Sequence, residues 1–210
     1  MFASGAGSNF EALARAAQRD ELGGTLAVLL CDQPGAPVLA RAQRLGIEAL
    51  TFASPRHRTR LDDEAPWLEA LRARQVDVVL LAGFMRRLHA TLLEPYAGRM
   101  VNIHPSLLPA YPGLDAIGQA WRAGARVTGC TVHLVEDALD AGPVLAQALV
   151  ERAAGDTQAA LEARVHEAEH VLYPTIVKRF LTEPWRIEDR HVRFGDGPGL
   201  GLANAGSAHG

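Results

Sequence analysis

An amide and an imidazole stand two residues apart at the end of an apolar run. In "MVNIHPSLLPAYPG" (100–113), Asn102 and His104 close a stretch of strand-forming residues, and a spacing of two places both side chains on one face of a strand. Asp140 belongs to the polar loop "EDALDAGP" (136–143), which could reach them. Amide and imidazole donors can hold a developing oxyanion, and a carboxylate favours the charged imidazole. These three residues predict acyl transfer.

The nearest hydroxyl belongs to Ser106. Its flanking residues do not resemble the G-x-S-x-G turn that exposes a catalytic serine, and no cysteine occupies such a turn nearby. Direct attack by the acceptor molecule is therefore favoured over a covalent intermediate.

Small residues precede a helix-forming segment in "SGAGSNFEAL" (4–13). Such a turn exposes backbone N–H groups at the positive end of a helix, which suits a phosphate group. Alternatively, Ser8 and Glu11 could form a capping box and nothing more. A dinucleotide site is a further alternative, in which Asp32 would bind a ribose, although Phe10 stands where that fingerprint has its third glycine.

The segment "HEAEH" (166–170) fits the H-E-x-x-H zinc pattern. Five-residue patterns recur by chance in a helix rich in His and Glu, and no third ligand follows at a suitable spacing. We favour a half-exposed helix and expect no metal.

Apolar, Val- and Leu-rich runs alternate with segments of helical period. This alternation predicts an α/β fold with a doubly wound, mostly parallel sheet covered by helices on both faces, and ligands in such sheets bind at the carboxyl ends of the strands. The second half adds strands of mixed pairing and a long helix over about 157–180. The predicted strands are 25–31, 47–52, 77–82, 99–104, 127–135 and 144–150. The first strand, before Gly5, is short enough that we expect residues to be missing there.

The composition is ordinary for a globular protein, with 48% hydrophobic and 21% charged residues and a net charge of -3. No apolar run has the length of a membrane helix, and no basic stretch suits nucleic acid. "RHRTR" (56–60) is the one basic cluster, and the cysteines Cys31 and Cys130 lie in apolar runs. We expect reduced thiols, a cytoplasmic location and neither membrane nor nucleic-acid partners.

Several motifs together resemble the glycinamide ribonucleotide transformylases, which are folate-dependent formyltransferases. The resemblance runs from about residue 2 to 180 through "SGAGSNFEAL", "DVVLLAGFMRRL", "NIHPSLLPAYPG", "GCTVHLVEDALDAGPVLAQ" and "AEHVLYP". It implies a Rossmann-like formyltransferase domain over 1–185, with a phosphate-binding first half and a folate-binding second half. Residues 186–210 would form an appendage that is Gly-rich and disordered from about 194.

The resemblance also implies an activity and a set of roles. The formyl group of 10-formyltetrahydrofolate would pass to the amine of 5'-phosphoribosylglycinamide (GAR), in a monomer or homodimer without metal. The catalytic residues would be Asn102, His104 and Asp140, with His104 as proton donor. The residues binding the ribonucleotide would be Gly7, Ser8, Asn9, His166 and Glu169. The folate pocket would comprise Arg60, Met85, Arg86, Arg87, Leu88, Asn102, Glu136, Asp137, Ala138, Leu139 and Asp140.

Two departures from the family pattern stand near these positions. The segment "LDAIGQAW" (114–121) lacks a Thr-His pair found in many relatives, and Arg87 replaces a common apolar residue. Hydrolysis of the same folate, with water replacing the amine, is the main alternative activity, and a non-catalytic nucleotide-binding module is the alternative outside enzymology.

Overall fold

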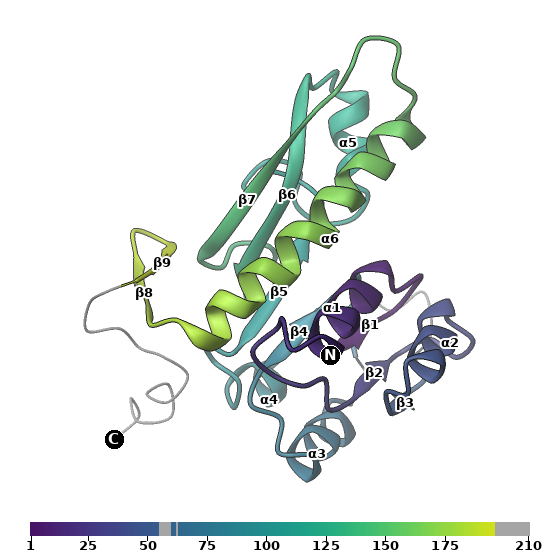
Figure 1. Cartoon of the computed structure of the whole chain (residues 1–210), viewed down its shortest axis with the longest axis vertical. Coiled ribbons are helices and arrows are strands. Elements are labelled where there is room, and N and C mark those ends of the chain that lie inside the picture. The colour runs from purple at the N-terminus through teal and green to yellow at the C-terminus, as the bar shows by residue number, and fades with distance from the viewer. Residues whose placement is uncertain (55–59, 62, 196–210) are drawn as a thin grey trace.

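A computed structural model describes residues 1–54, 60–61 and 63–195. Within these residues the strands form one nine-stranded sheet in the order β3-β2-β1-β4-β5-β6-β7-β9-β8 (Figure 1). The strands are β1 Phe2–Ala3, β2 Leu29–Cys31, β3 Ala49–Thr51, β4 Val79–Leu81, β5 Met100–His104, β6 Val127–Leu134, β7 Val144–Glu151, β8 Trp185–Glu188 and β9 His191–Phe194.

The sheet changes character between its two halves. Strands β3, β2, β1, β4 and β5 are parallel, whereas β5–β6 and β6–β7 pair antiparallel. Successive strands are added on one side of β1 as far as β3, and then on its other side from β4 onward. The strand order therefore reverses between β1 and β4, and α/β sheets open a crevice for ligands at such a point. The predicted doubly wound, mixed sheet is confirmed, and the predicted short first strand, β1, has two residues.

Helices cover both faces of the sheet. One buried cluster includes side chains of α1, α2, α5 and α6, and a second includes those of α3 and α4, as expected when apolar strands are buried on both sides. The helices are α1 Ser8–Gln18, α2 Pro37–Arg44, α3 Ala65–Ala73, α4 Ala90–Leu93, α5 Ala116–Arg122 and α6 Gln158–Thr182.

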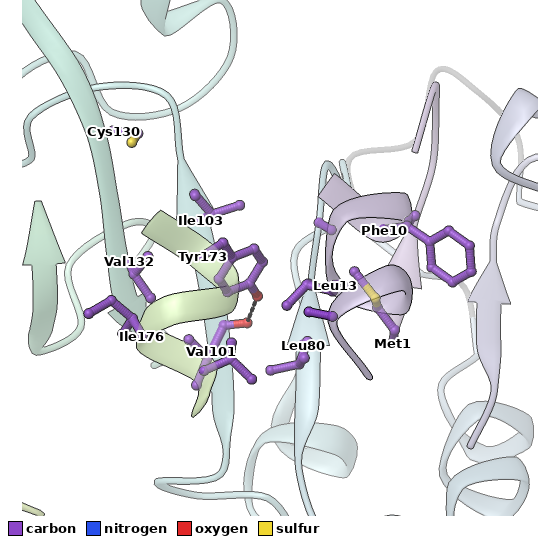
Figure 2. Close-up of a cluster of buried hydrophobic side chains, with 14 of the residues drawn as sticks. Met1, Phe10, Leu13, Leu80, Val101, Ile103, Cys130, Val132, Tyr173 and Ile176 are labelled. Carbon is purple, nitrogen blue, oxygen red and sulfur yellow. Dashed lines mark hydrogen bonds between the residues drawn. The ribbon is translucent and has the colours of Figure 1, made fainter. Parts of the chain in front are cut away.

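The long helix α6 is fixed to the middle of the sheet by one buried hydroxyl. The Tyr173 O–H is shared between the carbonyl oxygens of Leu81 and Val101, each 2.9 Å from its Oη, and Figure 2 shows the contact with Val101. Tyr173 is fully buried, and its hydroxyl therefore needs such partners. This contact ties α6 to β4 and β5, the strands that lead to the predicted site.

The predicted appendage contains more structure than the sequence indicated. Trp185 stacks on Phe180 with ring centroids 5.0 Å apart, and β8 and β9 form an antiparallel hairpin that joins the sheet where His191 pairs with Val144. Phe194 ends β9. The disorder expected from about residue 194 falls almost entirely on residues 196–210, which lie outside the described residues. A domain boundary at residue 185 stays a prediction.

Candidate active site

The structure brings the three predicted catalytic residues together. Asn102 and His104 end β5, and Asp140 lies in the loop between β6 and β7. The His104 Nδ1 is 3.5 Å from the Asp140 Oδ2, and both side chains are less than a tenth exposed. The His104 imidazole and the Asp140 carboxylate are 36 positions apart in the sequence but are neighbours in the structure, at the carboxyl end of a central strand.

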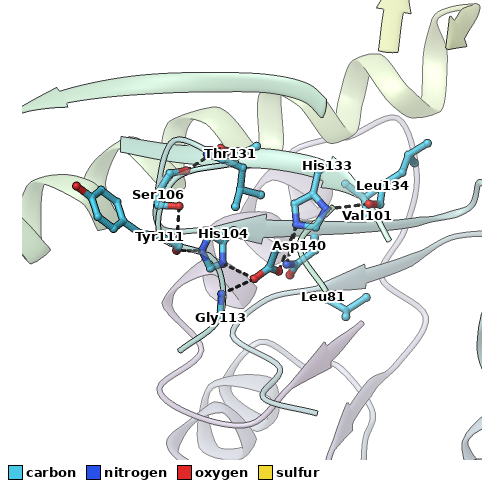
Figure 3. Close-up of polar contacts among 12 residues, drawn as sticks. Leu81, Val101, His104, Ser106, Tyr111, Gly113, Thr131, His133, Leu134 and Asp140 are labelled. Carbon is cyan, nitrogen blue, oxygen red and sulfur yellow. Dashed lines mark hydrogen bonds and ion pairs between the residues drawn. The ribbon is translucent and has the colours of Figure 1, made fainter. Parts of the chain in front are cut away.

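Both ring nitrogens of His104 face acceptors (Figure 3). Its Nε2 lies 2.9 Å from the carbonyl oxygen of Tyr111, which can only accept, so Nε2 carries a proton. Its Nδ1 faces Asp140. The separation of 3.5 Å is longer than a normal hydrogen bond, so a ligand atom can compete for a proton on Nδ1.

The loop that carries Asp140 is shaped by its D-A-G-P sequence. Asp140 has a φ of 49°, in the left-handed region, and its Oδ2 accepts the N–H of Gly113 at 2.7 Å. At Gly142 a Cβ atom would lie 1.9 Å from the carbonyl oxygen of Leu134, so only glycine fits this close approach. The motif therefore sets where the carboxylate points.

His133 also belongs to the site, although its place in the sequence gave no sign of it. It lies directly opposite Asn102 in the β5–β6 ladder, and the Asn102 Nδ2 is 3.1 Å from the His133 Nε2. The His133 Nδ1 is 2.8 Å from the Leu134 carbonyl oxygen, so it carries the proton and Nε2 accepts from the amide. Burial lowers the pKa of His133. This effect is larger than the opposite effects of the hydrogen bond to the Leu134 carbonyl and of the Asp140 charge, which both raise the pKa. A neutral His133 thus holds the Asn102 amide in one orientation.

A cleft opens beside this cluster, and it unites most of the predicted folate residues. Its lining combines catalytic side chains, the segment after β4 and the loop after β6. The lining residues are Leu81, Phe84, Arg86, Arg87, Leu88, Asn102, His133, Val135, Glu136, Asp137, Ala138, Leu139 and Asp140. Arg60 and Met85 are absent from it, although Arg60 forms a β-bridge with Arg87. A wider concavity between β7 and α6 contains none of the predicted site residues.

The predicted phosphate turn is a glycine-capped helix start. Gly7 is the N-cap of α1 with φ 77°, and no side chain caps the helix. Glu11 instead pairs with Arg15 and Arg41, so the capping-box alternative is wrong. The Arg41 Nε donates to the Ala6 carbonyl at 2.8 Å, which holds the turn from the α2 side. The N–H groups of the first helical turn are left for a ligand.

The "HEAEH" segment faces this turn from α6. The Glu169 Oε2 accepts from the Asn9 Nδ2 at 2.8 Å and lies 2.9 Å from the His166 Nδ1. The hydrogen bond to Glu169 raises the pKa of the half-exposed His166. Among residues 1–54, 60–61 and 63–195, no three His, Cys, Asp or Glu side chains are grouped to hold a metal ion. The hydrogen bond from Asn9 places Glu169 beside the turn that the sequence predicts to bind phosphate.

Asp32 is unavailable to a nucleotide. It is fully buried and its Oδ2 accepts from the Arg86 Nε at 2.6 Å, so the dinucleotide alternative loses its ribose-binding acid. Of "RHRTR", only Arg60 lies within the described residues. Within the described part of the chain, no helix has both the length and the apolarity to cross a membrane.

The two departures from the family pattern also have defined positions. "LDAIGQAW" begins at the exposed Leu114 and forms most of α5 from Ala116 onward. The Arg87 Nη2 lies 3.4 Å from the Asp137 carbonyl oxygen, so this side chain spans from one wall of the cleft to the other.

An α/β sheet with an amide, two imidazoles and a carboxylate gathered at the carboxyl end of β5 defines a group-transfer enzyme of Rossmann-like architecture. Residues 1–177 match the family described as formyl transferase, and the chain belongs to that family.

Within this family, the similar proteins include phosphoribosylglycinamide formyltransferases. The chain is 43% identical over 181 residues to a phosphoribosylglycinamide formyltransferase of Bacillus subtilis, covering 86% of this chain and 93% of the relative. A glycinamide ribonucleotide transformylase structure from Geobacillus kaustophilus is 49% identical with a TM-score of 0.79, covering 84% and 94% of the two chains. One from Symbiobacterium toebii is 39% identical with a TM-score of 0.87, covering 93% and 92%.

Proposed function

We propose that the chain transfers the formyl group of 10-formyltetrahydrofolate to the amine of GAR, giving N-formyl-GAR and tetrahydrofolate in purine biosynthesis. The observation that carries this proposal is the single cleft in which Asn102, His133 and Asp140 meet the two segments expected to bind the folate. The formyl transferase family and the names of the relatives support the same reaction.

The reaction needs a stabilised oxyanion and one net proton transfer. The amine nitrogen attacks the formyl carbon, and the carbonyl electron pair moves to oxygen. That oxyanion would accept a hydrogen bond from the Asn102 amide, whose orientation is set by His133. Collapse of the intermediate re-forms the carbonyl and breaks the bond to N10 of the folate, which receives a proton as the amine loses one.

His104 is our candidate for the proton donor to the intermediate. Its Nδ1 lies 3.5 Å from the Asp140 Oδ2, and both side chains are less than a tenth exposed. Asp140 is in turn held by the Gly113 N–H. Proton transfer by a positioned side chain contributes about 10²–10⁴-fold to rate.

The ribonucleotide would occupy the crevice between the α1 turn and α6. The N–H groups that follow Gly7 would hold the phosphate, with Ser8 and Asn9 at the same turn. Glu169 would contact the ribose, with His166 beside it. The Asn9–Glu169 hydrogen bond of 2.8 Å already links the two groups that would bind these parts of the molecule.

The folate would occupy the cleft between the segment Met85–Leu88 and the loop 136–140. Arg60 stands beside that segment through its bridge with Arg87 and would contribute to the same pocket. No step of the proposed reaction needs a metal.

Donor consumption separates the candidate functions. The protein is incubated with 10-formyltetrahydrofolate, with and without GAR, and loss of the donor is followed. Loss that depends on GAR supports transfer, loss without GAR supports hydrolysis, and no loss supports a binding module. A parallel reaction in a chelator tests the metal: activity should persist, and its disappearance together with stoichiometric zinc in the protein would contradict the mechanism.

A further inference from the structure

A buried ion pair lies at the wall of the cleft, where Arg86 is one of the lining residues. Asp32 and Arg86 meet at 2.6 Å, with side chains 0% and 4% exposed. Two charges removed from water carry a desolvation penalty, and an apolar pair of similar volume is often at least as stable. Stability alone therefore does not explain why a carboxylate and a guanidinium stand here, and their position in the fold becomes the relevant observation.

The pair joins three separate parts of the sheet edge. Asp32 directly follows β2, Arg86 belongs to the segment after β4, and the Arg86 Nη2 also lies 3.4 Å from the carbonyl of Ser54, which follows β3. The Gln33 Nε2 donates to both the Asp32 Oδ2 and the Ser54 carbonyl, at 2.9 and 3.1 Å. The guanidinium is thus held by groups at the carboxyl ends of two neighbouring strands.

The segment that carries Arg86 is held at both of its ends as well. The Met85 N–H donates to the Ser4 Oγ at 3.0 Å, and the His89 N–H donates to the Glu64 carboxylate at 2.7 Å. Between these points Arg86 is buried while Arg87 is exposed and reaches across to the Asp137 carbonyl. Fixing Arg86 inward therefore determines how Arg87 and its neighbours face the cleft.

We propose that Asp32 and Arg86 are positioning residues for the folate pocket. Their ion pair fixes the wall formed by the segment after β4, and the Arg86 guanidinium serves the wall rather than the ligand. Asp32 is fully buried and cannot touch a ligand, so any effect it has on folate binding must act through the side chains it holds, Arg86 and Gln33. This proposal rests on the proposed function, because it takes the cleft to be the folate site.

Asp32→Asn is the more specific test of the ion pair, because asparagine has nearly the same shape as aspartate but no charge. Its Oδ1 has no hydrogen-bond partner among the described residues, so Arg86 supplies its main compensation. Misplacement of a binding group by about 1 Å can cost about 100-fold. Asp32→Asn should therefore weaken binding of tetrahydrofolate by at least about tenfold while changing binding of GAR less than about twofold.

Calorimetric titration of the full chain with tetrahydrofolate and, separately, with GAR measures both affinities. Asp156→Asn is the matched control, since Asp156 pairs with Arg164 outside the residues that line the cleft, and it should change neither affinity. Unchanged folate binding in a folded Asp32→Asn protein, or equal losses for both ligands, would overturn the proposal.

Two further measurements keep the outcome interpretable. If Asp32→Asn fails to fold, the double variant Asp32→Leu with Arg86→Met replaces both charges by apolar groups. It should fold and still bind folate weakly, and wild-type affinity would overturn the proposal.

Tetrahydropteroate, which lacks the glutamate tail, should lose affinity by the same factor as tetrahydrofolate. A loss confined to folates with the tail would mean that Arg86 contacts the tail, which would overturn the proposal. If the wild-type chain binds no folate, the proposed function itself fails.

Discussion

Two clusters, each pairing a histidine with a carboxylate, flank the proposed site, and the pKa of the histidine is shifted in opposite directions in the two. Beside β5, His133 is 3% exposed and 3.8 Å from Asp140, and burial lowers its pKa. On α6, His166 is 50% exposed and 2.9 Å from Glu169, and that hydrogen bond raises its pKa. The same two residue types therefore give a neutral ring in one place and favour a charged ring in the other. Burial and distance decide which, because desolvation opposes charge and a close anion favours it.

The two histidines should also have opposite effects on stability as pH changes. Between the lowered pKa of His133 and its ordinary value of 6.5, the unfolded chain binds more protons than the folded chain, so stability rises with pH. Between 6.5 and the raised pKa of His166, the folded chain binds more protons, so stability falls with pH. The four predictions below test whether the clusters have the separate roles assigned to them.

The largest effect is expected in the first cluster, at Asp140. Asp140→Asn removes the charge that faces His104 and should lower kcat/KM at least about 100-fold, the low end for losing general-acid catalysis. Steady-state kinetics should also show that combining it with His104→Ala costs little more than His104→Ala alone, because the two act as a unit. Multiplicative losses would mean that Asp140 acts on the folate and not through His104.

The next largest effect is expected at Gly7, in the turn before α1 that faces the second cluster. Gly7→Val adds a Cβ that would lie 2.4 Å from the Val38 Cγ2, at a φ of +77°. Overpacking of this kind costs about 1–3 kcal/mol, and we expect KM for GAR to rise about tenfold with little change for the folate. Gly46→Val is the control, since Gly46 also has a positive φ but open space around it. Equal increases for both substrates would contradict the assignment of the turn.

A smaller loss is expected at His133, which supports Asn102 without itself donating to the intermediate. His133→Leu removes the acceptor of the Asn102 amide and should lower kcat about fivefold, less than the roughly 10²–10³-fold cost of deleting an oxyanion donor. Urea unfolding at several pH values should show a shallower rise of stability with pH below 6.5 than in the wild type. An unchanged slope would mean that His133 is charged in the folded chain.

The smallest effect is expected at His166. Because its side chain is half exposed, solvent screening limits the His166–Glu169 pair to roughly 0.3–1 kcal/mol. His166→Gln should therefore reduce the free energy of unfolding by this amount below pH 6.5, and by less as the pH rises through the raised pKa of the wild-type ring. The reverse order would show that Glu169 does not favour the charged ring.

Much of the catalytic cluster could be predicted from the sequence, because the features that indicate it extend over only a few residues. A spacing of two residues is sufficient to place Asn102 and His104 on one face of β5, and the D-A-G-P turn indicates a loop. Alternating apolar runs likewise predicted the sheet and its helices, because a strand buried on both faces must be apolar throughout. The β8–β9 hairpin was missed, since its strands have four residues each and mix polar with apolar side chains.

Contacts between distant segments were decided by the tertiary structure. His133 lies on the face of β6 that meets Asn102, yet the contact depends on the antiparallel β5–β6 register between residues 31 positions apart. The pairing of Asn9 with Glu169 spans 160 positions.

The sequence by itself determined the residue types, their spacing along each element and the class of sheet, because periodicity and turn chemistry act over a few residues. The tertiary structure decided which side chains meet and which are deprived of water. It placed Glu169 of the zinc-like helical pattern against Asn9 in the first turn of α1, and it buried Asp32 against Arg86 in place of a ribose site. Charge state, which follows from burial and from neighbours brought in by folding, could not be obtained from spacing alone.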